Sequence, residues 1–494
     1  MRSPTRVLVI GLDSADPGLI KKWCDAGDLP VLGSLRDRSR WGVLTSPPGL
    51  ADDGVWASFS TSVSPGRHGR YSTKSLSAGS YGNPKFRDED LKHETFWSAL
   101  GQSGHRLVII DVPKTPLARN FDGIQIRDWI VHGRDGSIDS WPEEIAGQLE
   151  ERFGRDTTDD PATADFLCKM TQLDELNGIA LVKELLKTLE QKTQVAMELL
   201  ERGNWDLFLT VFKECHCATH QFWHVLDDTH PAYDAALSRR LSNPIKKIYQ
   251  AIDTAIGRLL ELAGPDAHVI VFSDLGMAAN YTGGYILDRI LRRLELAGNT
   301  WYQNASITLA RAAHRAAASL SLGRYELTPQ RFRRAFQVNH NELSGAIRIN
   351  LKGREPHGQI PPGRELEEFC AALTRDLLDL ENPATGDAVV HEVLRTIDLF
   401  DGNHLDALPD LFVVWNRDAP IYCARSKKLG EIEFQHPALR TGNHIQNGVY
   451  FLCGPHIEAG EQLEAVSIMD IGPTIATILG SPLSRVDGKS IAAD

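Results

Sequence analysis

The sequence of 494 residues has no run of eighteen apolar residues, and its opening, MRSPTRVLVIGLDSAD, has no apolar stretch of signal-peptide length. From this absence we expect neither a membrane partner nor an export signal. Cysteine is also scarce. The chain has seven cysteines, an odd number, and they are scattered along its length. Such usage is typical of reduced thiols rather than of a disulfide framework, so we expect a cytoplasmic protein.

The chain has no excess of positive charge. Its 53 lysines and arginines are outnumbered by 65 aspartates and glutamates, which gives a net charge of −12 at pH 7. This balance argues against a nucleic-acid partner, because such partners are bound by neutralising phosphates. An acidic protein that handles a small anionic substrate needs a local cation instead, either a metal ion or a few placed arginines.

What the sequence does contain is an alternation of buried-strand and helix patterns. The apolar runs end in polar residues and have helical stretches between them; they are RVLVIGLD, HRLVIIDVP, WDLFLTVF, HVIVFSDLG and DLFVVWN. This alternation predicts an α/β fold whose mostly parallel central sheet is covered on both faces. Sites in such sheets form beyond the carboxyl ends of the strands. Because Asp13, Asp274 and the His216 region all lie at such ends, we predict one shared site.

The length suggests one large domain with inserted segments, or two domains. We predict a single domain over residues 1–494, with residues 134–200 and 279–361 as candidate cap insertions, because the strand and helix alternation is interrupted there. The first region is polar and then strongly helical, and the second contains a basic stretch. Both could cover a site, or both could be surface elaborations without a part in chemistry.

The densest group of candidate ligands is VFKECHCATHQFWHVLDD, which carries His216, His220 and His224 at intervals of four residues. Residues four apart share one face of a helix, and a histidine pair at this spacing is a common two-ligand arrangement for zinc-like metals. The alternative is a partly exposed helix that happens to be rich in histidine. His444, in the glycine-containing loop RTGNHIQNG, could supply a third nitrogen. We predict His216, His220 and His444 as ligands, and not His224.

The two strand-end aspartates are weaker candidates when each is taken alone. Asp13 ends the first strand in GLDSADP. Its alternative role is that of a helix N-cap without a part in chemistry. Asp274 lies in FSDLGM, where a carboxylate could simply satisfy the backbone of the turn.

Seven segments in order resemble the type I phosphodiesterase/nucleotide pyrophosphatase group of the alkaline phosphatase superfamily. They are VLVIGLDSADPGLIKKWCDAGDLPVLGSLRDRSRWGVLTSPP, VWASFSTSVSPGRHGRY, ECHCATHQFWHVLDDTHPAYD, VIVFSDLGM, AIRINLKGREPHG, ALRTGNHIQNGVYFLCGPHI and SIMDIGPTIATILGSPLSRVDGKSI. The resemblance extends over nearly the whole chain. It implies an alkaline phosphatase-like three-layer α/β/α sandwich with inserted cap segments.

The resemblance also implies a two-metal site. Carried over by motif, the first metal lies on His216, His220 and His444, with His216 where the family has aspartate. The second keeps Asp13 and Asp274, but Leu275 replaces the family's histidine, and leucine cannot bind a metal. We therefore expect a divalent metal at the three histidines, zinc first and iron or manganese next, and leave a second metal open.

The family's serine or threonine nucleophile has no clear match. The aligned window, ADDGVW, offers Asp52, or Ala51 under a shifted alignment, and neither is a hydroxyl. Thr45 or Ser46 could reach in from a longer loop. Asp52 or Asp53 could bind the second metal, attack through an acyl phosphate or act as a base on water, unless the pair is a solvent-facing acidic turn.

These departures predict a metal-dependent hydrolase of a phosphodiester, nucleotide-type phosphoester or related anionic ester, in which metal-bound water attacks directly. Three neutral imidazoles leave a metal its full charge, which favours bound hydroxide near neutral pH. Arg354 in LKGREPHG could bind the substrate anion, or form an ordinary salt bridge. The alternatives are a transferase or lyase of specialised metabolism on the same scaffold, or a non-catalytic anion-binding relative.

Overall fold

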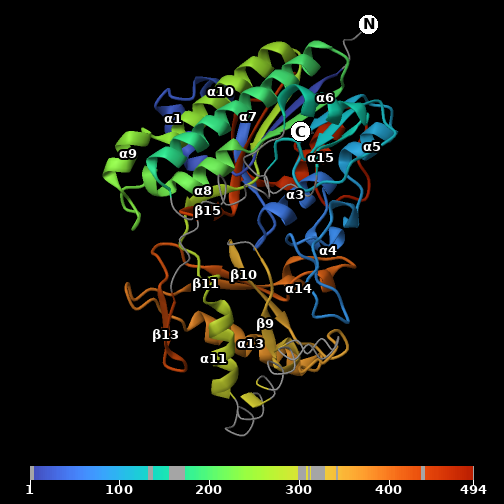
Figure 1. Cartoon of the computed structure of the whole chain (residues 1–494). Helices are drawn as coiled ribbons and strands as arrows, with labels where there is room; N and C mark the ends of the chain where they lie inside the picture. The colour runs from blue at the N-terminus through green and yellow to red at the C-terminus, as the bar shows by residue number, and fades with distance from the viewer. Residues whose placement is uncertain are drawn as a thin grey trace. The chain divides into compact units, whose positions relative to one another are not determined.

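The computed structural model describes residues 5–131, 137–154, 173–298, 308–309, 312, 329–340, 343–434 and 440–492. The chain forms two compact units. Unit 1 consists of Met1–His68, Arg87–Asn280 and Ala438–Asp494, and unit 2 of Gly69–Phe86 and Tyr281–Pro437. Figure 1 labels some of the elements of both units.

Unit 1 is built on a nine-stranded sheet in the order β17-β2-β16-β7-β1-β6-β3-β4-β5. The five neighbours from β7 to β4 run parallel, whereas β16 and β5 pair antiparallel. The strands are β1 (Val7–Leu12), β2 (Arg40–Thr45), β3 (Leu107–Ile110), β4 (Gly123–Arg127), β5 (Asp139–Trp141), β6 (Leu207–Phe212), β7 (His268–Ser273), β16 (Asn447–Cys453) and β17 (Gly460–Ser467). Every residue of β1 and β6 is buried, as their continuous apolar sequences predict.

Helices cover both faces of this sheet. Leu8 and Ile10 of β1 share one apolar cluster with helices α1 (Pro17–Asp25), α2 (Pro30–Asp37), α7 (Glu175–Glu201), α8 (Glu214–Leu226) and α10 (Pro244–Ala263). On the other face, Trp56 and Phe59 of α3 (Asp52–Thr61) contact Phe272 of β7, and α5 (Phe96–Gln102) and α15 (Ile471–Ile478) pack beside α3. The predicted three-layer α/β/α sandwich is therefore confirmed (Figure 1).

Shorter elements complete unit 1. Strands β8 and β15 form a two-stranded antiparallel sheet, and His444 of the candidate site lies on β15. The elements are α4 (Pro65–His68), α6 (Glu144–Phe153), α9 (Ala235–Leu241), β8 (Gly276–Ala279), β15 (Gly442–Ile445) and the 3-10 turns Asp88–Asp90 and Ile468–Asp470. Among the described residues, no helix combines the length and apolar character needed to span a bilayer.

Unit 2 has its own core around a four-stranded antiparallel sheet in the order β11-β12-β10-β9. Its elements are α11 (Leu287–Gly298), β9 (Ala335–Gln337), β10 (Ser344–Ile349), α13 (Arg364–Leu378), β11 (Val390–Arg395), α14 (Thr396–Leu399), β12 (Leu411–Trp415), β13 (Cys423–Ser426), β14 (Gly430–Glu433) and the 3-10 turns Pro329–Phe332 and Leu405–Ala407. The run DLFVVWN was wrongly grouped with the parallel strands, because β12 pairs antiparallel with both β10 and β11. The sequence of a buried apolar strand does not indicate whether the neighbouring strands run parallel or antiparallel to it.

The predicted insertions map differently onto the units. In residues 134–200, helix α7 packs on the main sheet through Leu181, Leu185 and Leu189, so this helix belongs to the core of unit 1. Residues 134–136 and 155–172 lie outside the described residues. Residues 281–361 belong to unit 2, which also takes in residues up to Pro437 and the earlier segment Gly69–Phe86. A capping role for either insertion stays a prediction.

Candidate active site

Three parallel strands of unit 1 deliver polar residues to one edge of the sheet. Leu12, the last residue of β1, pairs with Phe212 of β6 on one side and Ser273 of β7 on the other. Asp13, Lys213 and Asp274 are therefore the next residues along these three strands. Helix α8 begins immediately after Lys213, which places its first turn at the same edge. The shared site predicted at the strand ends thus has a geometric basis.

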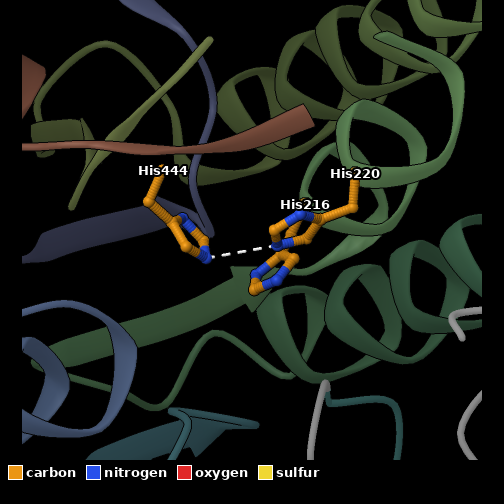
Figure 2. Close-up of side chains that lie close together, drawn as sticks. All are labelled: His216, His220 and His444. Atoms are coloured by element: carbon orange, nitrogen blue, oxygen red, sulfur yellow. Dashed lines mark hydrogen bonds between the residues drawn. The ribbon is translucent and has the colours of Figure 1, made fainter. Parts of the chain in front are cut away.

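His216, His220 and His444 converge in unit 1. His216 and His220 lie one turn apart on α8, and His444 lies on β15, opposite Met277 of β8. The ring centroids are 4.6 to 4.9 Å apart, and the Nε2 atoms of His220 and His444 are 3.2 Å apart. Figure 2 shows the three rings turned toward one another. One nitrogen of each ring lies within 4.8 Å of the others, the spacing of a group that can hold one metal ion.

The backbone fixes how His220 presents its nitrogens. Its Nδ1 lies 2.7 Å from the Gly442 carbonyl oxygen, which can only accept a hydrogen bond. Nδ1 therefore carries the proton and Nε2 keeps its lone pair. Glycine is required at 442, because a Cβ there would lie 2.2 Å from the Thr219 carbonyl oxygen. Burial, together with the charge of Arg440, holds the pKa of His220 well below its usual value, so the ring stays neutral.

A second group, formed by Asp13, Asp52 and His216, overlaps the first at His216. Asp13 Oδ1 lies 3.0 Å from His216 Nδ1, and Asp52 Oδ1 lies 3.2 Å from His444 Nε2. Burial lowers the pKa of His216, but the Asp13 carboxylate outweighs it and raises that pKa to about 9. Asp52 begins α3 with φ +30°, a left-handed value that non-glycine residues seldom adopt.

Two predicted residues lie outside both groups. Asp274 Oδ1 accepts the Ser14 N–H at 2.8 Å, and burial, followed by the charge of Asp13, raises the pKa of Asp274 well above its usual value. The carboxylate of Asp53 faces Lys114, with Oδ1 and Nζ 3.9 Å apart. The structure thus separates Asp53 from Asp52, because successive helix residues point about 100° apart.

The hydroxyls near the site are engaged elsewhere. Ser46 Oγ donates to the Asp274 carbonyl at 2.6 Å, and Thr45 Oγ1 donates to the Val466 carbonyl at 3.1 Å. Ser14 Oγ, which the sequence analysis did not single out, donates to Asp13 Oδ1 at 3.1 Å and is fully buried. Leu275, in place of the family's histidine, is also fully buried.

Arg354 belongs to unit 2, where its guanidinium is already bound. It donates to Glu355 through Nε, to Asp410 through Nη1 and Nη2, and to the Ile349 carbonyl. These partners all lie in unit 2 and make Arg354 part of an internal ion-pair network. Nothing in this arrangement supports the predicted contact between Arg354 and substrate.

Two cationic residues near predicted site residues were missed by sequence reasoning. Lys114 follows β3 and faces Asp53, and Arg440 Nη1 lies 3.5 Å from His220 Nε2. Arg440 stands four residues before His444 in RTGNH, so its position was visible in the sequence. The direction of the Arg440 side chain was not visible there, because it depends on the pairing of β15 with β8.

The residues present fit a divalent metal. Three buried imidazoles converge, one with its lone pair fixed by a backbone hydrogen bond, and such a group could hold a metal ion. His224 is not part of this group, and its Nδ1 lies 2.9 Å from Thr441 Oγ1.

Comparison with known proteins gives one family and several similar structures. The family model for type I phosphodiesterase/nucleotide pyrophosphatase matches residues 7–439. Phosphonoacetate hydrolase from Sinorhizobium meliloti 1021, in complex with phosphonoformate, is similar with a TM-score of 0.52 and 12% identity, over 97% of this chain and 95% of that chain. An inactive form of murine ectonucleotide pyrophosphatase/phosphodiesterase 5, in complex with AMP, has a TM-score of 0.51 and 12% identity, over 98% and 97%. At this identity the two structures show the shared fold. No curated protein matches the sequence.

Proposed function

The chain belongs to the type I phosphodiesterase/nucleotide pyrophosphatase family, and from this membership we propose that it is a metal-dependent hydrolase of small phosphoesters or related anionic esters. Hydrolysis of phosphoesters is the chemistry that the family indicates. The two similar structures hold phosphonoformate and AMP, which are both small anions. We further propose that water, and not a hydroxyl of the chain, attacks the ester.

The observation that carries this proposal is a carboxylate beside three convergent imidazoles. Asp52, the first residue of α3, has its Oδ1 within 3.2 Å of His444 Nε2. The nearby hydroxyls of Thr45 and Ser46 donate to backbone carbonyls instead. From this arrangement we infer that Asp52 stands where the family reaction uses a serine or threonine nucleophile.

His216, His220 and His444 would hold one divalent metal, zinc first and iron or manganese next. When bound, such an ion supplies Lewis acidity toward the ester oxygen and makes water more acidic. The Gly442 carbonyl keeps His220 in the tautomer that leaves Nε2 free to bind, and Asp13 orients His216 through Nδ1. Partners of this kind fix ring orientation and raise ligand basicity.

We propose Asp52 as the general base. In this reaction the oxygen of water forms a bond to phosphorus, the bond to the leaving oxygen breaks, and the Asp52 carboxylate accepts the proton of water. Asp52 has a left-handed backbone, and its Oδ1 lies 3.2 Å from His444 Nε2. The N-terminus of α3 adds positive potential where negative charge develops on the reacting group.

Metal content and hydrolysis test the proposal together. Wild type, purified without a histidine tag, is expected to hold one equivalent of metal and to hydrolyse p-nitrophenyl phosphate or bis-p-nitrophenyl phosphate. His216→Ala is expected to lose both properties. His224→Ala is the matched control on the same helix and should keep them, because His224 is not part of the metal group. Metal-free wild type, or metal retained in His216→Ala, would contradict the proposal.

A further inference from the structure

The Arg440 side chain places a positive charge beside the three imidazoles. Its Nη1 lies 3.5 Å from His220 Nε2, the nitrogen that also lies 3.2 Å from His444 Nε2. Arg440 is half-buried, so solvent and a small solute can reach it. The partly exposed guanidinium therefore lies beside the metal group.

The backbone around Arg440 is firmly held. The Arg440 carbonyl accepts from Asn280 Nδ2 at 3.0 Å, and the next residue, Thr441, donates to the His220 carbonyl and accepts from the Asn280 N–H. Strand β15 starts one residue later and pairs with β8. An arginine on such a support can present its N–H groups in a fixed direction, as preorganised binding requires.

No carboxylate lies within ion-pair distance of Arg440 in the part of the chain that the structure describes. Its closest acceptor is the His220 Nε2 lone pair. That lone pair is the one a metal would take, because His220 Nδ1 is committed to Gly442. With a metal in place, the guanidinium would lose this acceptor and lie next to a second positive charge. An anion that bridges the two cations removes this repulsion and satisfies the N–H groups.

We propose that Arg440 binds the non-bridging oxygens of the substrate's reacting group and makes the site selective for a terminal, doubly charged phosphate or phosphonate. The planar guanidinium pairs with two oxygens at once, and each hydrogen bond strengthens with the charge on those oxygens. A monoester dianion carries two charges, whereas an internal phosphodiester carries one. This inference rests on the proposed hydrolase function and narrows its substrate class.

The test compares wild type with Arg440→Met, Arg440→Lys and the exposed control Arg239→Met. Each protein is checked first for metal content and melting temperature. kcat/KM is then measured for p-nitrophenyl phosphate, a monoester, and for bis-p-nitrophenyl phosphate, a diester. Binding of inorganic phosphate to each metal-loaded protein is measured by calorimetry, which needs no turnover.

Wild type is expected to prefer the monoester. Arg440→Met should lose about 100-fold in monoester kcat/KM and in phosphate affinity, as loss of a charged hydrogen-bonded pair implies, with little change for the diester. Arg440→Lys keeps the charge without the planar fork, so its monoester kcat/KM and phosphate affinity should lie between those of wild type and Arg440→Met. Arg239→Met should match wild type. A wild-type preference for the diester, or equal losses on both substrates with metal content unchanged, would overturn the proposal.

The two proposals can fail separately. If metal-loaded wild type hydrolyses neither ester but binds phosphate in an Arg440-dependent way, the hydrolase proposal fails and the anion role of Arg440 stands. If wild type is active and Arg440→Met keeps its monoester rate and phosphate affinity, the role of Arg440 fails and the hydrolase proposal stands.

Discussion

Asp52 and Asp53 are adjacent residues with different surroundings. Asp52 Oδ1 lies 3.2 Å from His444 Nε2, whereas Asp53 Oδ1 faces Lys114 Nζ at 3.9 Å. If Asp52 is the general base, Asp52→Asn should lower kcat about 10²- to 10⁴-fold, the usual contribution of such a group. Metal content should not change. Asp53→Asn is the matched control and should keep most of its kcat, so equal losses in steady-state assays would contradict the assignment.

The same residue allows a second prediction, about the nucleophile. A carboxylate that attacks phosphorus directly would leave a phosphoryl group on the chain, whereas a carboxylate that takes a proton from water would not. We expect the intact mass of wild type, quenched during turnover, to show no phosphoryl adduct. An adduct present in wild type and absent in Asp52→Asn would show that Asp52 is the nucleophile.

His224 predicts part of the pH dependence of stability. Burial, and next the charge of His230, lowers the pKa of His224 from 6.5 to about 4. A histidine with a lowered folded-state pKa contributes stability that is complete above pH 6.5 and is lost as pH falls from 6.5 toward 4. The loss can reach about 3 kcal/mol, because each pKa unit corresponds to about 1.4 kcal/mol. In urea unfolding of metal-free protein, His224→Gln should lose less stability than wild type between pH 6.5 and 4. Parallel curves would contradict this.

At the scale of elements, one buried ion pair joins α7 to the main sheet. Lys192 Nζ lies 3.0 Å from Asp111 Oδ2 just after β3, and it also donates to the carbonyls of Ile130 and Val211. Both side chains of the pair are fully buried. Lys192→Met leaves the Asp111 charge without its cation, which should cost about 3–5 kcal/mol in the free energy of unfolding.

The control for that prediction is an exposed ion pair that joins α6 to α7. Arg152→Met breaks the contact between Arg152 and Glu198 of α7, and both of these side chains are about half exposed. Exposed pairs contribute about 0–1 kcal/mol, so this variant should unfold close to wild type. The double variant Lys192→Met/Asp111→Asn should recover part of the loss, since no buried charge then remains. A Lys192→Met protein as stable as Arg152→Met would contradict the role of the buried pair.

Helix α7 and strand β12 show what a sequence conveys about single elements and what it leaves out. The apolar period of Glu175–Glu201 predicts a helix with one buried face, and the structure has one. The apolar pattern of a helix is the same whether its buried face covers a sheet or a substrate. The pattern therefore gave no independent support to the prediction that residues 134–200 form a cap. Likewise the apolar run at Leu411–Trp415 predicts a buried strand without the direction of its partners.

At the scale of the whole molecule, unit 1 is assembled from three stretches of chain, and the site takes residues from each. Asp13 and Asp52 come from the first, His216 and His220 from the second and His444 from the third. The sequence predicted that Asp13 and the α8 histidines lie together, because the carboxyl ends of parallel strands meet at one edge of the sheet. His444 could be expected only from a motif, since nothing in a linear sequence gives the register of β15 on β8. Arg440 escaped prediction for the same reason.

This division of the chain leads to a prediction for metal removal. The described groups that can hold a metal all lie in unit 1, and unit 2 has a separate core. A metal that binds only the folded state stabilises it by about 4 kcal/mol when its free concentration is 1,000 times Kd. Chelation should therefore raise amide hydrogen exchange in α8 and β15 and leave β10 and β12 of unit 2 unchanged.

His216→Ala supplies the control for chelation, because this variant should already exchange like the chelated protein and show no further change. Restoring zinc to chelated wild type should return the protection of α8 and β15. Equal loss of protection in both units would mean that the metal acts through the stability of the entire chain, and not through the elements that carry its ligands. The pattern of exchange, rather than the melting temperature alone, therefore locates the metal in unit 1.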